Sequence, residues 1–278
     1  MNVQAIIDKT VTALNEVPGV VGVVLGGSRA RGTNRPDSDI DIGIYYDSAY
    51  PLDLIGMGSI ATRLDDTHRE NIIAPPGGWG EWVNGGGWLV MDGYHVDFIF
   101  RDIRRAAQVI EDCLAGKITT HYHAGHPHAY INAMYMGEIA ICKILMDRDQ
   151  RLEGLKTKTK PYPVNMKKSL IDYFMFEAGF SAMLAENNAD KDDIYYLTGH
   201  LFRAISCLNQ VLFAMNEEYC INEKKAVRII DGFVKKPLKY KERVTEVFKL
   251  PGSGANGPSD ACCHLRGLLA DVKALETE

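Results

Sequence analysis

A short apolar run that ends in two glycines constrains the fold of this chain more than any other feature. Residues 20–25, VVGVVL, have the length and β-branched composition of a buried strand. The run stops at Gly26-Gly27-Ser28, and a second strand is predicted over residues 39–46. Because side chains alternate across a strand, Asp39 and Asp41 project from one face and the neighbouring isoleucines from the other. The sequence therefore predicts a strand, a glycine turn and a second strand that carries two carboxylates on one face.

The chemistry of this unit suits a phosphate ligand and a divalent cation. Two carboxylates side by side repel each other unless a cation lies between them. Mg²⁺ prefers hard oxygen ligands and usually takes one or two protein carboxylates together with phosphates and water. Backbone at Gly27 can approach phosphate oxygens because it has no side-chain bulk, and Ser28 adds a hydroxyl and opens a helical turn. The unit thus predicts a site for a triphosphate and magnesium.

A later hairpin supplies a third carboxylate. Apolar runs at 87–91 and 94–100 flank Asp92-Gly93, which is a strong hairpin signal. Asp97 lies within the second run, on the face opposite its apolar neighbours. A third acid near a metal can hold a second ion or take the proton from an attacking hydroxyl. Asp92 is the competing candidate, but turn geometry alone explains an aspartate at that position.

The rest of the chain is predicted to be helical. Residues 2–17 form an amphipathic helix, and strand signals vanish after about residue 103. Helices are expected near residues 103–115, 128–148, 165–187, 193–217 and 259–275. We therefore predict an α+β fold with a mixed sheet and helices in domain 1–120, followed by an all-α bundle in domain 121–278.

These motifs, taken in order, resemble those of a known superfamily. Residues 26–33 (GGSRARGT), 38–41 (SDID) and 96–98 (VDF) are similar to the pattern of the DNA polymerase β-like nucleotidyltransferases. Within it the chain looks like the antibiotic nucleotidyltransferases, which act on aminoglycosides and lincosamides. The motifs cover about residues 20–100, and the helical C-terminal part is similar to that family in architecture only.

The resemblance implies a role for each motif residue. Asp39 and Asp41 would bind Mg²⁺, with two ions expected, and Asp97 would complete the metal site or act as the base. Gly27 and Ser28 would hold the β- and γ-phosphates of an NTP. An acceptor hydroxyl would attack the α-phosphate in line, transferring an NMP, with AMP expected, and releasing pyrophosphate. Arg31 would either contact phosphate or pin the turn, and the sequence favours neither role.

Charge and composition limit the classes of partner that the protein can have. The net charge is −5 with a pI of about 5.9, and no basic stripe of the kind that follows a polynucleotide is evident. A small acceptor is therefore expected rather than a long nucleic acid. No apolar run reaches the ~18 residues that span a bilayer, no signal peptide is evident and the six cysteines are scattered. We expect a soluble, cytoplasmic protein with reduced thiols, and relatives that build the site across a dimer allow a homodimer.

Several features leave alternatives open. A regulatory nucleotidyltransferase of toxin–antitoxin type, acting on or binding a protein partner, is a second hypothesis, although no histidine follows Arg203 at the spacing of HEPN ribonucleases. The segment HYHAGHPH, residues 121–128, is either a loop or, less in keeping with its spacing, a zinc site. Residues 77–88, rich in glycine and tryptophan, are either a flap whose indoles stack on a ligand ring or a packed loop. The lysines between 156 and 168 either face the triphosphate or form a solvated surface.

Overall fold

The computed structural model describes residues 2–276, and the backbone divides into two compact units. The first unit takes the chain up to Glu111 together with residues 135–161. The second takes residues 112–134 and the described residues from 162 onward. The units are thus interleaved along the sequence, whereas the sequence predicts one boundary at residue 120.

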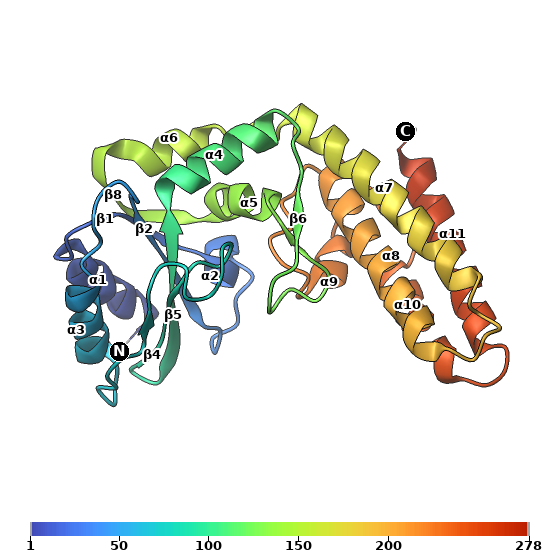
Figure 1. Ribbon diagram of the computed structural model, residues 1–278, viewed down its shortest axis with the longest axis horizontal. Helices are drawn as coiled ribbons and strands as arrows, with labels where there is room; N and C mark the ends of the chain where they lie inside the picture. Colours follow the sequence, from blue (N-terminus) through green and yellow to red (C-terminus); the bar gives the residue numbers. More distant parts are fainter. Residues whose placement is uncertain (1, 277–278) are drawn as a thin grey trace. The chain divides into compact units, whose positions relative to one another are not determined.

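The first unit is built on a six-stranded sheet with the order β3-β4-β5-β2-β1-β8 (Figure 1). Strands β2 and β5 are parallel, and every other neighbouring pair is antiparallel. The strand bounds are Val20–Leu25 for β1, Ile40–Tyr46 for β2, Ile73–Ala74 for β3, Gly86–Met91 for β4, Tyr94–Asp102 for β5 and Lys143–Asp147 for β8.

One face of this sheet carries the core. The helices α1 (Val3–Asn15) and α3 (Leu54–Leu64) lie together against it (Figure 1). Alternation along the strands turns the apolar side chains to this face, and burying each one stabilises the fold by ~1.5–3 kcal/mol. The fully buried members of the strands include Ile40, Ile42, Ile44, Val96, Phe98 and Phe100. The residues between them, Asp41 and Asp97 included, are left for the opposite face.

The helix predicted over 128–148 is wrong in its second half. Helix α5 covers Ala133–Ile141, and residues 143–147 form β8, which pairs with β1 at the edge of the sheet. The ammonium of Lys156 donates to the carbonyls of Ile139, Ala140 and Cys142 at 2.7–3.0 Å and so satisfies the end of α5. Three apolar residues in a row, Ile144–Met146, do not distinguish helix from strand, but the open edge of β1 requires a partner.

The second unit is mainly helical. Its long helices α7, α8 and α11 run side by side (Figure 1). A two-stranded ribbon, β6 (Thr120–His121) with β7 (Tyr130–Ile131), precedes them. The helices of this unit are α7 (Val164–Glu186), α8 (Ile194–Met215), α9 (Ala226–Ile230), α10 (Tyr240–Lys249) and α11 (Gly257–Leu275).

Three further helices lie within residues 2–276: α2 (Gly27–Arg31), α4 (Ile103–Leu114) and α6 (Arg151–Thr157). Two 3₁₀ turns cover Arg148–Gln150 and Leu250–Gly252. The predicted α+β fold with a helical C-terminal region is confirmed. Within residues 2–276, no helix is both long enough and apolar enough to cross a membrane.

Candidate active site

Two of the three predicted carboxylates are neighbours on the sheet. The parallel register of β2 and β5 pairs Asp41 with Asp97. Paired residues point to the same face, and adjacent strands lie ~4.8 Å apart. Both side chains are half-buried. The fold therefore brings together two acids from separate strands on the face that the core leaves open.

The third acid, Asp39, lies in the loop just before β2. It is exposed and lies two residues before Asp41 in the sequence. Arg29, a residue to which the sequence assigns no role, fixes this loop. Its guanidinium donates to the carbonyls of Asp39 at 3.0 Å, Pro36 at 3.3 Å and Ser38. Arg29 thus pins the turn, which is one of the two roles that the sequence left open for Arg31.

The glycine turn lies directly against Asp41. The amide of Gly26 donates to the carbonyl of Asp41 at 2.8 Å. Gly27 has a left-handed φ of 58°, and a Cβ added there would collide with the carboxylate of Asp41. Ser28 follows in the first turn of α2, and Arg31, half-buried, ends that helix. Only glycine at position 27 leaves room beside the Asp41 carboxylate.

The donor set fits magnesium in its chemistry. Among residues 2–276, no three or more His, Cys, Asp or Glu side chains form a group able to hold a metal ion by themselves. Mg²⁺ does not require such a cage, because one or two carboxylates and the phosphates of a substrate suffice. The Asp41–Asp97 pair supplies carboxylate oxygens on one face, and the backbone of Gly27 lies directly against the Asp41 carboxylate.

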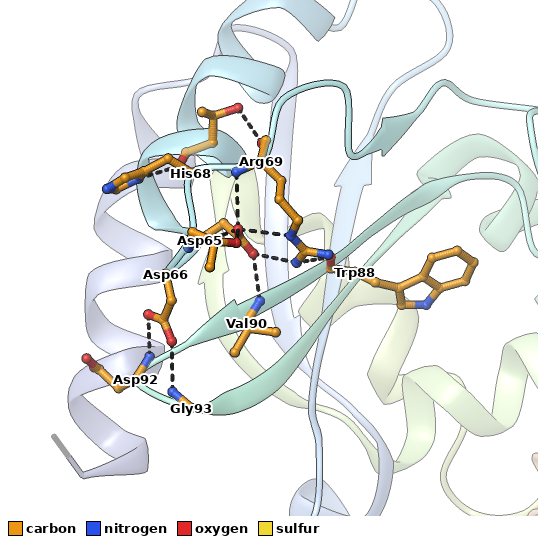
Figure 2. Close-up of polar contacts among 10 residues, drawn as sticks. Asp65, Asp66, His68, Arg69, Trp88, Val90, Asp92 and Gly93 are labelled. Atoms are coloured by element: carbon orange, nitrogen blue, oxygen red, sulfur yellow. Dashed lines mark hydrogen bonds and ion pairs between the residues drawn. The ribbon is translucent and has the colours of Figure 1, made fainter.

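A buried carboxylate that the sequence did not reveal holds the hairpin that carries Asp97. Asp65 follows α3, and Figure 2 shows it at the centre of a polar cluster. It accepts from the guanidinium of Arg69 and from the amide of Val90 at 2.9 Å. Arg69 in turn donates to the carbonyl of Trp88 at 3.1 Å. These hydrogen bonds, Arg69 first among them, hold the pKa of Asp65 well below its usual range.

The neighbouring Asp66 fixes the hairpin turn itself. Its two carboxylate oxygens accept from the amides of Asp92 and Gly93 at 2.8 and 2.9 Å (Figure 2). Asp92 is exposed and has a φ of 48°. The turn geometry therefore accounts for Asp92, the acid that competes with Asp97 in the sequence.

The glycine- and tryptophan-rich segment is tied down at several points. The side-chain oxygen of Asn84 accepts from the amide of Gly77 at 2.8 Å, and its carbonyl accepts from the amide of Trp79 at 2.9 Å. Trp82 is buried, with the guanidinium of Arg105 4.3 Å from the centre of its ring. Trp88, in contrast, is 61% exposed. The segment is thus a packed loop that presents one open indole.

The histidine segment makes contacts within the helical unit. His126 Nδ1 lies 3.1 Å from the carboxylate of Glu223, which also accepts from the amide of His128. The ring of His128 lies 3.6 Å from the thiol of Cys207. Burial lowers the pKa of His128 and raises that of Cys207 to about 12, so this pair is neutral at neutral pH.

Three of the five lysines between residues 156 and 168 make local contacts. Lys156 caps α5, Lys158 pairs with Glu111, and Lys167 pairs with Glu217 at 2.8 Å. Each of these contacts lies within one unit.

Comparison with known families identifies the part of the chain that contains this site. Residues 7–115 match the family model for the nucleotidyltransferase domain. These residues form a nucleotidyltransferase domain. The match includes the glycine turn, Asp39, Asp41 and Asp97, and the resemblance predicted from the sequence is confirmed. The family transfers nucleotides from NTPs, and the coarse activity of the protein, an enzyme of nucleotide transfer, follows from it.

Two solved structures to which the chain is similar are distant from it in sequence. A nucleotidyltransferase-like protein from Exiguobacterium sibiricum is 10% identical with a TM-score of 0.45, over 96% of this chain and 74% of that one. An aminoglycoside 6-adenyltransferase from Bacillus subtilis is 13% identical with a TM-score of 0.37, over 99% of this chain and 90% of that one. At these values neither likeness bears on the substrate. No curated protein matches in sequence.

Proposed function

We propose that this nucleotidyltransferase moves an NMP, with AMP expected, from an NTP–Mg²⁺ complex to a hydroxyl of a small molecule. The proposed acceptor class is that of aminoglycoside or lincosamide antibiotics, which would make the protein a resistance enzyme. The observation that carries the proposal is the pairing of Asp41 with Asp97 on one sheet face, with the glycine turn at Gly27 against the Asp41 carboxylate. The net charge of −5 suits a cationic acceptor better than a polynucleotide.

Each site residue has a proposed role in the reaction. Asp39 and Asp41 would hold Mg²⁺, and Asp97 would complete the site or serve as the base. When bound, the metal neutralises charge on the phosphates and polarises the phosphorus–oxygen bonds. Gly27 and Ser28 would bind the β- and γ-phosphates. The acceptor oxygen would form a bond to the α-phosphorus as the bond to pyrophosphate breaks, and Asp97, where it serves as the base, would take the hydroxyl proton.

Replacing the acids one at a time tests this assignment. Asp39→Asn and Asp41→Asn remove carboxylate charge from the metal site, so we expect kcat/KM to fall at least ~100-fold, about 2.7 kcal/mol of transition-state stabilisation. Asp97→Asn should abolish transfer while largely sparing binding of NTP–Mg²⁺. The measurement is release of pyrophosphate from radiolabelled NTPs across a panel of aminoglycosides and lincosamides.

Asp92→Asn is the matched control, because Asp92 is an exposed acid of the same hairpin. Its activity should equal that of the wild type. Unchanged turnover in Asp97→Asn would reduce Asp97 to a surface acid. If wild-type protein neither binds NTP–Mg²⁺ nor releases pyrophosphate with any acceptor, the proposed function is wrong.

One observation favours keeping the second hypothesis, a regulatory enzyme that acts on or binds a protein partner. Helix α7 exposes Tyr173, Phe176, Phe180 and Met183 at helical spacing, with Phe176 70% exposed. Exposed apolar stripes of this kind are typical of protein-binding surfaces. Transfer of label from NTP to a protein rather than to a small molecule would identify this alternative.

A further inference from the structure

An exposed indole stands in the same row as the two paired acids. The antiparallel register of β4 and β5 pairs Trp88 with Asp97, just as β2 and β5 pair Asp41 with Asp97. Paired residues share a face, so the three side chains follow one another across the strands. Trp88 is 61% exposed, although burial of an indole is strongly favourable. Figure 2 shows its ring projecting from β4 away from the Asp65 cluster.

A second indole backs this ring. Trp79 stacks on Trp88 with ring centroids 4.5 Å apart and planes at 18°. A Cβ at Gly86 would collide with the carbonyl oxygen of Phe98 and lie 3.0 Å from the Trp79 ring, so glycine lets β4 pack against both. The Trp79 amide is bonded to Asn84, and the Trp88 carbonyl to Arg69. Backbone hydrogen bonds therefore hold both tryptophans in place, and the exposed face of the Trp88 ring is preorganised.

The order of strands across the sheet places the Trp79–Trp88 pair on the side from which the acceptor would attack. From one edge to the middle, the strands carry Trp88 on β4, Asp97 on β5 and Asp41 on β2, with the turn at Gly27 against Asp41. In-line transfer requires that the attacking hydroxyl and the leaving pyrophosphate lie on opposite sides of the α-phosphorus. With pyrophosphate at the glycine turn and the acids in the middle, the attacking group comes from the Trp88 side.

We propose that Trp88, backed by Trp79, is the platform on which the acceptor lies, and that the acceptor is a hydroxyl-bearing ring compound. This inference rests on the proposed function and deepens it. The indole would stack on a ring face of the acceptor and so bring one ring hydroxyl next to Asp97. Amino groups on the ring would add an attraction between the cation and the π face. Trp88 would act on the acceptor and not on the nucleotide.

Substitution at Trp88 separates acceptor binding from nucleotide binding. In Trp88→Ala, equilibrium dialysis with radiolabelled ATP–Mg²⁺ should give the wild-type Kd within twofold. The KM for the acceptor should rise ~10-fold or more, because stacking of a ring on the aromatic side chain is lost. Trp88→Phe keeps an aromatic face and should raise that KM only ~2–3-fold. Tyr50→Ala, which removes a 65%-exposed aromatic beyond the other end of β2, is the control and should change neither value.

Fluorescence gives a second readout that needs no turnover. Tryptophan fluorescence is measured while kanamycin, neomycin, lincomycin or a simple glycoside is added to the wild type and to Trp88→Phe. Compounds of the acceptor class should change the emission of the wild type and not that of Trp88→Phe. ATP–Mg²⁺ alone should leave the emission of Trp88 unchanged. Trp79 and Trp82 emit in both proteins, so the signal of Trp88 is the ligand-dependent difference between the wild type and Trp88→Phe.

Three results would overturn the proposal. ATP–Mg²⁺ binding that weakens fivefold or more in Trp88→Ala would place the nucleobase on the indole. Turnover of any acceptor with an unchanged KM in Trp88→Ala would leave the indole without a role. A panel in which no ring compound alters Trp88 emission would also contradict it. Failure of the proposed function is recognised separately, since wild-type protein would then bind no ATP–Mg²⁺, and the platform would fall with it.

Discussion

At the scale of residues, Asp65 is the side chain on which the active-site hairpin most depends. Its carboxylate is fully buried and links the end of α3 to Arg69 and to the amide of Val90 on β4. Asp65→Asn removes the charge from hydrogen bonds of the strong, charge-assisted kind, so we expect a loss of about 2 kcal/mol in the free energy of unfolding. Urea denaturation measures this loss. Asp37→Asn, which breaks an exposed pair with Arg35, should cost under about 1 kcal/mol.

The same residue predicts a dependence on pH. The folded-state pKa of Asp65 is lowered, and so is that of Asp47, to about 2, by Arg104 and Arg151. A lowered pKa stabilises the fold above the unfolded value of about 3.9, and this stabilisation is lost as the pH falls below it. The stability gap between wild type and Asp65→Asn should therefore narrow below about pH 4. A gap of constant size from pH 7 to pH 3 would contradict the assignment.

At the scale of elements, the glycine turn packs against β2. Substitutions at two glycines, Gly27 and Gly32, test whether ligand binding depends on this packing. Gly27→Ala would force a Cβ against the Asp41 carboxylate and strain a left-handed residue by ~1–2 kcal/mol. We expect ATP–Mg²⁺ affinity to fall at least tenfold in a protein that remains folded. Gly32→Ala has a similar φ of 73° but an open surrounding, so only the backbone strain should remain. Equilibrium dialysis and thermal denaturation distinguish the two effects.

The local elements of this site could be predicted from the sequence, but their contacts could not. Alternating and β-branched runs indicate β1, β2 and the β4–β5 hairpin, because these patterns reflect burial within one segment. That β2 and β5 are parallel neighbours, which places Asp41 beside Asp97, depends on the order of strands in the sheet. The Asp65 cluster joins the end of α3 to β4, and no spacing along the chain encodes such a link.

At the scale of the whole molecule, the first unit includes residues that follow the start of the second unit in the sequence. Strand β8 covers the edge of β1, and Glu138 holds the buried guanidinium of Arg101 through two hydrogen bonds of 2.8 Å. Both lie beyond residue 120, where the sequence predicts the domain to end. Periodicity and composition reveal segments, whereas the closing of a sheet edge is a requirement of the assembled unit.

Two fragments test where the domain ends. A fragment of residues 1–120 would lack β8 and Glu138, leaving the edge of β1 open and the charge of Arg101 buried without its partner. We expect it to aggregate or to lack a cooperative unfolding transition by circular dichroism. A fragment of residues 1–161 keeps both and also Lys156, so it should unfold cooperatively. If the shorter fragment unfolds with the same midpoint as the longer one, the sheet needs no strand from the later part of the chain. The boundary at residue 120 is then correct and β8 is dispensable.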